Sequence, residues 1–306
     1  MVSRLEKNKK IEKEIKKEVK IEKKEKRKKR NRKFLAFIIS LLIIFFIYSY
    51  FIEPNLLLVN EKVILSSNIK EDLHGIKIVH FSDLHYGSSI NSKNIKKVIT
   101  KINELKPDIV VFTGDLLDIR YTEKYTKKEI DVLTDALKDI NASLGKYSII
   151  GNHDYNYTEL SNIYYDSNFN LLVNKSDIIY GKEGTTIGIY GFDNITYGEP
   201  NIENLKENGF ASSNLKIVLL HEGDYIDYFV NDIKVDVILG GHSHNGQVKL
   251  PFIKPILLPE GSKNYYEPYY NINNTDIYIS NGIGESTFNI RFNSIPSINF
   301  YRINKK

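Results

Sequence analysis

Five short runs of β-branched and leucine residues set the strongest limit on how this chain of 306 residues folds. Near-continuous apolar runs of this length are typical of strands that are buried on both faces of a sheet. Two segments between the runs, residues 91–105 and 127–140, have the spacing of amphipathic helices. This alternation predicts an α/β fold with right-handed crossovers. The runs are residues 76–81, 108–113, 146–150, 215–220 and 235–240.

Each of the five runs is followed by polar residues of types that bind metal ions. The loops read SDLHYG, GDLLD, GNHD, HEGD and GGHSHNGQ in chain order, and they hold five of the seven histidines. Because ligands of open α/β sheets collect beyond the carboxyl ends of the strands, we expect these side chains to meet in one crevice. The candidates are Asp83, His85, Asp115, Asn152, His153, His221, His242 and His244.

The types of side chain in these loops limit the chemistry. The chain contains no cysteine, which excludes disulfides and thiolate ligands. Imidazoles together with carboxylates favour Zn, Fe or Mn and argue against a calcium site made only of oxygens. Eight groups are too many for one ion, but they suit two ions about 3.5–4 Å apart that share a carboxylate. Because such a pair activates water and stabilises the attacking and leaving oxygens, the loops predict two-metal hydrolysis of a phosphoryl compound.

A separate apolar segment, residues 34–52, contains nineteen residues without a charge. At about 1.5 Å per residue, a helix of this length crosses the hydrocarbon core of a bilayer. A cleaved signal peptide is disfavoured because the preceding basic region is too long and no small-residue cleavage site follows. A buried core helix is disfavoured because no polar face is present. We therefore expect an uncleaved membrane anchor at 34–52, followed by a linker at 53–72.

The first 33 residues form a low-complexity tail of lysine and glutamate. They hold 17 basic and 6 acidic residues, a local charge of +11, so residues 34–306 carry −6 of the chain's net +5. The basic character therefore belongs to the tail, and we expect no nucleic-acid partner for the chain as a whole. Glutamates with lysine four residues later support a solvated helix beside the membrane. Contact of the tail with anionic lipid headgroups or RNA is the alternative.

The ordered motifs SDLH, GDLLD, GNHD, a single histidine and GGHSHNG resemble the calcineurin-like metallophosphoesterase superfamily. The resemblance covers residues 73–303, which we take as the catalytic domain. The segments GGHSHNGQVKLPF, YISNGIGES, IRFN and PSINFYRI are similar to a bacterial branch in which a membrane anchor often precedes that domain. The fold that the resemblance implies is a four-layer αββα sandwich, here preceded by one transmembrane helix.

The resemblance also implies two sets of metal ligands. Asp83, His85 and His244 would bind one divalent ion. Asn152, His221 and His242 would bind the second, and Asp115 would bridge the two. Asn245 is a departure, because the family pattern GHTHGGQ usually has glycine there. We expect the Asn245 side chain to face the mouth of the site and to alter the shape of the substrate that fits.

His153 and Asp154 are the catalytic residues that the resemblance implies. His153 would act as an acid or stabilise the phosphoryl group, and Asp154 would orient it. A loop hydrogen bond or a helix N-cap is an equally good interpretation of Asp154.

Three other features have two interpretations each. His80 lies within an apolar run, where a hydrogen-bonded core histidine is commoner than a functional one. Arg291 would meet a substrate phosphate or form a structural ion pair. The stretch NYYEPYY, residues 264–270, would form an aromatic rim for a lipid or a sugar, or a packed loop.

The predicted function is the hydrolysis of phosphate mono- or diesters by a membrane-anchored enzyme with a binuclear metal centre. A lipid- or sugar-linked phosphoester is one candidate substrate. One alternative is a lipid-linked pyrophosphatase similar to the UDP-diacylglucosamine hydrolases. Another is a membrane-tethered metal-binding protein without turnover, which the complete ligand set disfavours. A metal-dependent amidase or deacetylase is disfavoured by GNHD, which serves phosphate esters in the similar family. The sequence leaves the substrate, the metal pair and the oligomeric state open.

The charge asymmetry across residues 34–52 predicts the orientation of the chain. Basic residues are retained on the cytoplasmic side, so we expect residues 1–33 in the cytoplasm and the catalytic domain outside the cell membrane, with a single pass between them. Protease added to intact cells or spheroplasts should then remove the domain. Full protection of the domain until the cells are lysed would reverse this topology.

Overall fold

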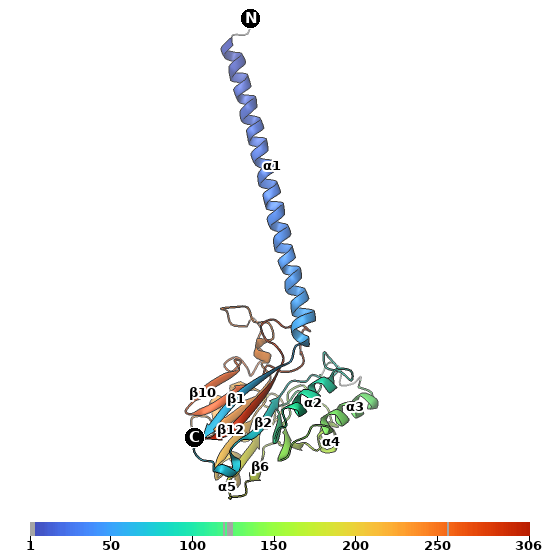
Figure 1. Ribbon diagram of the computed structural model, residues 1–306, viewed down its shortest axis with the longest axis vertical. Coiled ribbons are helices and arrows are strands. Elements are labelled where there is room, and N and C mark those ends of the chain that lie inside the picture. Colours follow the sequence, from blue (N-terminus) through green and yellow to red (C-terminus); the bar gives the residue numbers. More distant parts are fainter. Residues whose placement is uncertain (1–3, 119, 121–124, 256) are drawn as a thin grey trace. The chain divides into compact units, whose positions relative to one another are not determined.

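The computed structural model of the chain describes residues 4–118, 120, 125–255 and 257–306. Its contacts divide it into two compact units, residues 1–48 and 49–306. The first unit contains the helix α1 (Arg4–Ile47), and the second contains every strand of the structure. The ribbon of Figure 1 shows the helices and sheets of both units.

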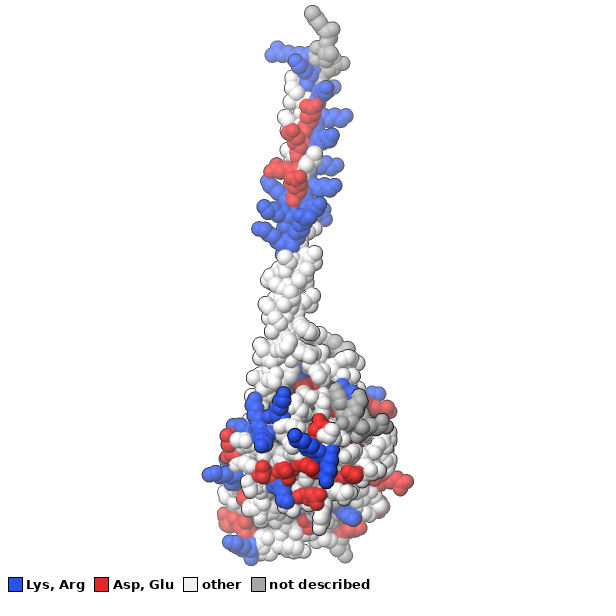
Figure 2. Space-filling view, turned by 90° about the vertical axis from the view of Figure 1, so that its right-hand side faces the viewer, with Lys and Arg blue, Asp and Glu red and all other residues white. Residues whose placement is uncertain are grey.

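Helix α1 is continuous through the basic tail and most of the apolar segment. Figure 2 shows basic side chains gathered on its N-terminal part, with acidic ones among them, and then a stretch without charge. Glu22 and Lys26 form an exposed i,i+4 ion pair at 2.6 Å, a contact that stabilises a helix only slightly. The apolar part is long and hydrophobic enough to be a candidate membrane span, and only 6% of it is buried. The last residues of the expected anchor form a separate turn, η1 (Tyr48–Ile52).

The second unit is built on two six-stranded sheets. The first sheet has the strand order β1 (Leu58–Ser66), β12 (Ser297–Lys305), β2 (Ile76–Phe81), β3 (Ile109–Phe112), β4 (Gly145–Ser148), β5 (Asn170–Leu171). The second sheet has the order β10 (Tyr269–Ile272), β11 (Thr275–Ile279), β9 (Val237–Gly240), β8 (Leu215–Leu219), β7 (Thr186–Gly191), β6 (Lys175–Tyr180). The five predicted strands are β2, β3, β4, β8 and β9, which are interior strands of the two sheets. Neighbours among them pair in parallel.

The two sheets pack against each other and are covered on their outer faces by helices. Ile78, Val111, Ile217 and Leu239 belong to the buried apolar cluster between the sheets. The outer face of the first sheet carries α2 (Ile95–Glu104), α3 (Lys127–Lys138) and α4 (Leu160–Asp166), which Figure 1 shows on one side of the domain. The outer face of the second sheet has only α5 (Asn208–Ala211) and short 3-10 turns such as η5 (Glu203–Lys206) and η6 (Gly223–Tyr228). The predicted αββα sandwich is confirmed, and the helical layer on the second sheet is the thinner of the two.

Sequence features account for the ends of these elements. Helix α3 begins with a capping box, in which Thr126 accepts a hydrogen bond from the Glu129 amide while the Glu129 side chain binds the Thr126 amide. His80 in β2 is the buried core histidine that we expected, with Nε2 2.9 Å from Thr113 Oγ1. Two tyrosines of the NYYEPYY segment pack against the domain. Tyr265 is buried, and the Tyr270 hydroxyl accepts hydrogen bonds from two backbone amides.

The expected linker at 53–72 is wrong for much of its length. Residues 58–66 form β1, which pairs in parallel with β12 over nine residues. Glu53 is also fully buried, and its carboxylate accepts hydrogen bonds from the amides of Asn293 and Ser294 at 3.0 and 2.6 Å. The folded domain therefore begins close to the end of the apolar segment. The sequence concealed this because β1 carries asparagine, glutamate and lysine on an edge of the sheet, where water satisfies polar side chains.

Candidate metal centre

The loops that follow the five predicted strands meet at one end of the domain. Asp83 and His85 follow β2, Asp115 follows β3, and Asn152 and His153 follow β4. The second sheet contributes His221 after β8 and then His242 and His244 after β9. All eight are buried or partly buried. The packing of the two sheets thus brings the expected side chains together.

One group of potential ligands consists of Asp83, His85 and His244, whose ligand atoms all lie within 4.8 Å of one another. Nε2 of His244 is 3.4 Å from Oδ1 of Asp83. The Nε2 atoms of His85 and His244 face each other at 3.1 Å. This arrangement of two imidazoles and a carboxylate suits a divalent ion.

A second group consists of Asp115, His221 and His242. Oδ2 of Asp115 is 3.2 Å from Nε2 of His221 and 3.6 Å from Nε2 of His85, so one carboxylate oxygen faces both groups. The backbone amide of His242 donates to both oxygens of Asp83 at 3.0 and 3.1 Å, which ties the two groups together.

Three buried atoms of the candidate ligands have no hydrogen-bond partner among the described residues. They are Nδ1 of His85, Oδ1 of Asn152 and Nε2 of His221, the last of which faces the Asp115 carboxylate at 3.2 Å. Buried polar atoms are costly without a partner, and an oxygen and an imidazole nitrogen are both ligands for Zn, Fe or Mn. The donor set therefore fits divalent metal ions.

The backbone of the site is held in an unusual conformation. Asp83, His85, Asp115, His242 and His244 have φ angles of 53°, 44°, 59°, 66° and 47°. This left-handed region is uncommon for residues other than glycine and costs about 1–2 kcal/mol for each residue. Strain of this kind concentrates at functional sites, where the surrounding fold enforces it.

Gly151, which precedes Asn152, is required by the close approach of two loops. A Cβ atom on Gly151 would lie 2.1 Å from Oδ1 of Asp115. A side chain there would displace the carboxylate that faces both groups of ligands, which explains the glycine of GNHD.

Carbonyl groups behind the imidazoles determine which nitrogen faces the centre. Nδ1 of His221 is 2.7 Å from the Thr113 carbonyl, which leaves Nε2 to face Asp115. Nε2 of His242 is 2.8 Å from the Glu260 carbonyl, which leaves Nδ1 for the centre. Hydrogen bonds of this kind fix the tautomer and orientation of a ligand histidine.

His244 has a different partner, because Nη2 of Arg291 lies 3.2 Å from its Nδ1. A guanidinium only donates, so this bond places the proton of the neutral imidazole on Nε2. Ligation through Nε2 therefore requires the ring to change tautomer and to release the bond. Arg291 is fully buried and pairs with the buried Glu285 at 3.4 Å, so the structure favours an ion pair over contact with a substrate phosphate.

Mutual electrostatics keep the buried carboxylates of the centre ionised. Burial alone would raise the pKa of Asp115, but the facing imidazoles of His221 and His153 outweigh it and hold the pKa well below its usual range. Burial lowers the pKa of His85, so its ring is neutral. Burial lowers the pKa of His221, but the charge of Asp115 outweighs it and raises the pKa well above its usual value. Because metal ions bind ionised carboxylates and neutral imidazoles, His221 must release a proton when it binds one.

His153 lies beside this centre with its backbone amide 2.8 Å from Oδ1 of Asp115. Its Nδ1 is 4.0 Å from Oδ1 of the fully buried Asp118, the last residue of GDLLD. The sequence did not single out Asp118, although its place in the motif was a signal. Arg120 binds the same carboxylate, with Nε 2.9 Å from Oδ1.

Asp154 has a structural role in the loops. Its carboxylate accepts hydrogen bonds from the amides of Leu117 and Gly151 at 2.9 and 3.1 Å. Burial and the charge of Asp115 raise the pKa of Asp154 to about 7. Of the two interpretations, these contacts favour the loop hydrogen bond over an orienting partner for His153.

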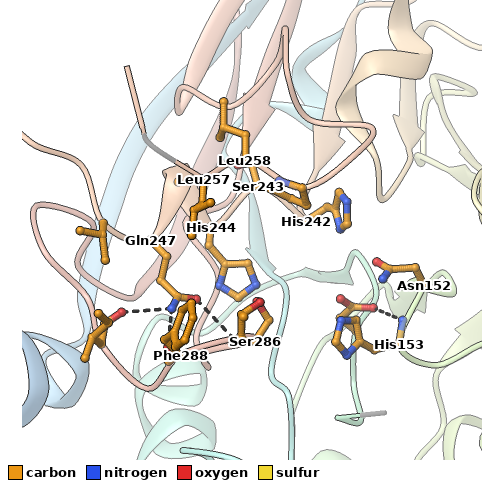
Figure 3. Close-up of a pocket in the computed structure, with 16 residues that line it drawn as sticks. Asn152, His153, His242, Ser243, His244, Gln247, Leu257, Leu258, Ser286 and Phe288 are labelled. Carbon is orange, nitrogen blue, oxygen red and sulfur yellow. Dashed lines mark hydrogen bonds between the residues drawn. The ribbon is translucent and has the colours of Figure 1, made fainter. Parts of the chain in front are cut away.

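A cavity of about 510 Å³ opens onto the centre. In Figure 3, Asn152 and His153 lie on one side of it and Leu257 and Phe288 on the other, with His244 between them. Asn245 is absent from the described residues that line this cavity, so our expectation that it faces the mouth is wrong. Its side chain is buried, and its φ of 51° explains why glycine suits the position.

The chain is similar to several known proteins. Residues 76–246 match the calcineurin-like phosphoesterase family. A Bacillus subtilis protein named metallophosphoesterase YkuE is 33% identical over 259 residues, which cover 84% of this chain and 88% of that protein. UDP-2,3-diacylglucosamine pyrophosphatase LpxG of Chlamydia muridarum is 27% identical over 265 residues, covering 72% of this chain and 79% of that protein. Among solved structures, the NAD nucleotidase of Haemophilus influenzae aligns with a TM-score of 0.45 and 16% identity, over 68% of this chain and 45% of that one.

The Arg291–Glu285 pair predicts a large difference between two arginines. Arg291→Met leaves the Glu285 carboxylate buried and unpaired, and we expect it to lower the free energy of unfolding by about 3–5 kcal/mol. Arg302→Met removes an exposed pair with Glu61 and should cost at most about 1 kcal/mol. Urea unfolding of the full chain in detergent, followed by tyrosine fluorescence, measures both. Equal losses in the two variants would contradict the role of the buried pair.

Proposed function

The chain belongs to the calcineurin-like phosphoesterase family, and from that premise we propose that it hydrolyses phosphate mono- or diesters with two divalent metal ions. Members of this family are hydrolases that use divalent metals. The observation that carries the two-ion proposal is the carboxylate of Asp115. One of its oxygens faces His221 at 3.2 Å and His85 at 3.6 Å, so it stands between the two groups of ligands.

Each ion has its own set of candidate ligands. We assign Asp83, His85 and His244 to one ion and Asn152, His221 and His242 to the other, with Asp115 shared. When bound, such ions supply Lewis acidity that polarises the phosphoryl group and makes water a nucleophile near neutral pH. The chain's own contribution is to hold these side chains rigidly by backbone strain and by the hydrogen bonds behind the imidazoles.

We assign His153 to the departing oxygen of the substrate. It lines the cavity beside Asn152, and its side chain is 19% exposed, so a substrate can reach it. Nδ1 lies 4.0 Å from the Asp118 carboxylate, so we assign the other ring nitrogen, Nε2, to the departing oxygen, to which it would donate a proton as a general acid. An alkoxide is a poor leaving group, so this proton assists departure.

We further propose that the apolar part of α1 anchors the domain in the cell membrane, with the domain on the extracytoplasmic side. The length of the uncharged segment and the basic residues before it support this arrangement. A pyrophosphatase acting on a lipid-linked substrate is the second candidate, because the similar Chlamydia protein is named for that activity. A non-catalytic role is disfavoured because the structure contains every candidate ligand.

Removing the shared carboxylate tests the two-ion site. Asp115→Asn should lower the metal content from two ions to one per chain and abolish nearly all turnover, while the fold persists. The measurements are metal analysis and hydrolysis of phosphomonoesters, phosphodiesters and pyrophosphates by the full chain in detergent, with Mn, Zn or Fe supplied separately. Two ions retained in the variant would disprove the bridging role. Exclusive hydrolysis of pyrophosphates by the wild type would select the second candidate.

Changing the leaving group tests His153. Protonation by a positioned imidazole contributes typically about 10²–10⁴-fold in rate, and a p-nitrophenolate needs little of this help. His153→Ala should therefore retain both ions and lose far more rate on an alkyl phosphoester than on its p-nitrophenyl counterpart. Equal losses with both ions present would mean that His153 stabilises charge on the phosphoryl oxygens. Loss of an ion would mean that His153 is a ligand.

A further inference from the structure

The cavity beside the metal centre has two walls of different chemistry. One wall consists of polar groups that include Asp115, Asn152 and His153. The opposite side includes Leu257 and Phe288, and the other apolar lining residues are Val248, Leu258, Pro259 and Ile290. Figure 3 shows Leu257, Leu258 and Phe288 on the side of His244 that is away from His153. A phosphoryl group held at the metal centre would therefore have its substituent against apolar side chains.

The apolar wall continues to the outer surface of the domain. Leu257 and Phe288 line the cavity and yet are 65% and 56% exposed. Phe252 and Ile253, in the same loop as Leu257, are also exposed to solvent. Large apolar side chains gathered around the mouth of a cavity mark a binding or membrane-contacting surface.

This surface lies next to the point where the apolar segment joins the domain. The backbone amide of Arg291 donates to the carbonyl of Ser49 at 2.9 Å, and Ser49 belongs to the uncharged run 34–52. Phe288 is three residues before Arg291. The loop that carries Phe252 is joined to the same strip by a hydrogen bond from the Lys249 amide to the Phe292 carbonyl at 2.8 Å. Within the folded domain, the strip that carries Phe288 therefore contacts Ser49, one of the first residues of that unit.

One basic side chain lies within this apolar loop. Lys254 is exposed between Ile253 and Leu257. A lysine beside exposed apolar side chains is suited to the phosphates of a lipid headgroup layer.

The remaining polar groups of the cavity are few. Apart from the metal centre, the described lining residues with polar side chains are Ser243, Gln247, Ser286 and Thr287, and none of these carries a charge. A sugar or nucleotide substituent would place hydroxyl groups against Leu258 and Ile290 without hydrogen-bond partners, which is unfavourable. A hydrocarbon chain loses nothing there and gains burial.

We infer that the cavity binds the hydrocarbon chain of a membrane lipid that carries a phosphoester, and that its mouth opens at the bilayer surface. This inference rests on the proposed function and specifies its substrate class. The lipid enters past Phe288 and Leu257, and its phosphoryl group reaches the metal centre while the chain stays on the apolar wall. A protein anchored a few residues from the mouth meets such a substrate without releasing it into water.

Two homologous series of substrates test the inference. They are monoalkyl phosphates and alkyl p-nitrophenyl phosphates with ethyl, octyl and dodecyl chains, hydrolysed by the full chain in micelles of a nonionic detergent. We expect kcat/KM for the dodecyl substrate to exceed that for the ethyl substrate at least tenfold in the wild type. We also expect Leu257→Asp and Phe288→Asp to reduce this ratio at least tenfold, because a carboxylate prevents burial of the chain.

Tyr180→Asp is the matched control. Tyr180 is an exposed aromatic residue on β6, outside the described residues that line the cavity, so its substitution should leave the ratio unchanged. Concentration of long-chain substrates in micelles affects every variant equally, so only the comparison between variants reports on the cavity. Leu257→Ser and Phe288→Ser, with the metal content of each, guard against a folding defect in the aspartate variants.

The outcomes separate this inference from the proposed function. Hydrolysis of ethyl and dodecyl substrates with equal kcat/KM would overturn the lipid assignment and leave the phosphoesterase proposal standing. An unchanged ratio in both cavity variants would also overturn it. Failure of the wild type to hydrolyse any phosphoester with Mn, Zn or Fe would overturn the proposed function, and the inference with it.

Discussion

The packing of the two sheets against each other is the contact on which the candidate site depends. Apolar side chains such as Ile78 and Leu239 fill the space between the sheets. Asp115 comes from the first sheet and His221 from the second, and their side-chain atoms approach to 3.2 Å. Because protein interiors are close-packed, a small change in the distance between the sheets would separate these atoms. The hydrophobic core thereby sets the distance between the candidate ligands of the first sheet and those of the second.

Residues 291–294, just before β12, contact both the start of the folded domain and the candidate metal centre. The backbone amide of Ser294 donates to the Glu53 carboxylate at 2.6 Å, and the Ser294 hydroxyl donates to the carbonyl of His244 at 2.6 Å. Arg291 in the same segment contacts the ring of His244. Glu53, which follows the apolar segment, is thus connected through Ser294 to the candidate ligand His244. The amides of Asn293 and Ser294 satisfy the buried Glu53 carboxyl group, whose burial would be costly without partners.

Five of the interior strands were predictable, and the remaining strands were not. Most side chains of β2, β3, β4, β8 and β9 are buried, and the runs that contain these strands are largely apolar, so they read as strands. β1 and β12 pair across more than two hundred residues of sequence, and β1 is an edge strand whose only buried side chains are Ile64 and Ser66. Local sequence carries no signal of such a partner, because the pairing is decided by which surfaces remain uncovered after the core forms. The boundary of the domain was misplaced for this reason.

The sequence by itself determined the types of ligand, their order along the chain and the end of the sheets where they gather. Strand periodicity and the absence of cysteine were sufficient for that, since both are local or compositional properties. Only the tertiary structure decided that Asp115 faces both groups of ligands, that Asp118 approaches His153, and that Arg291 pairs with Glu285 in the interior. It also decided that the segment carrying Phe288 lies close to Ser49, at the start of the folded domain. These are relations between segments far apart in sequence, and they exist only once the two sheets have packed.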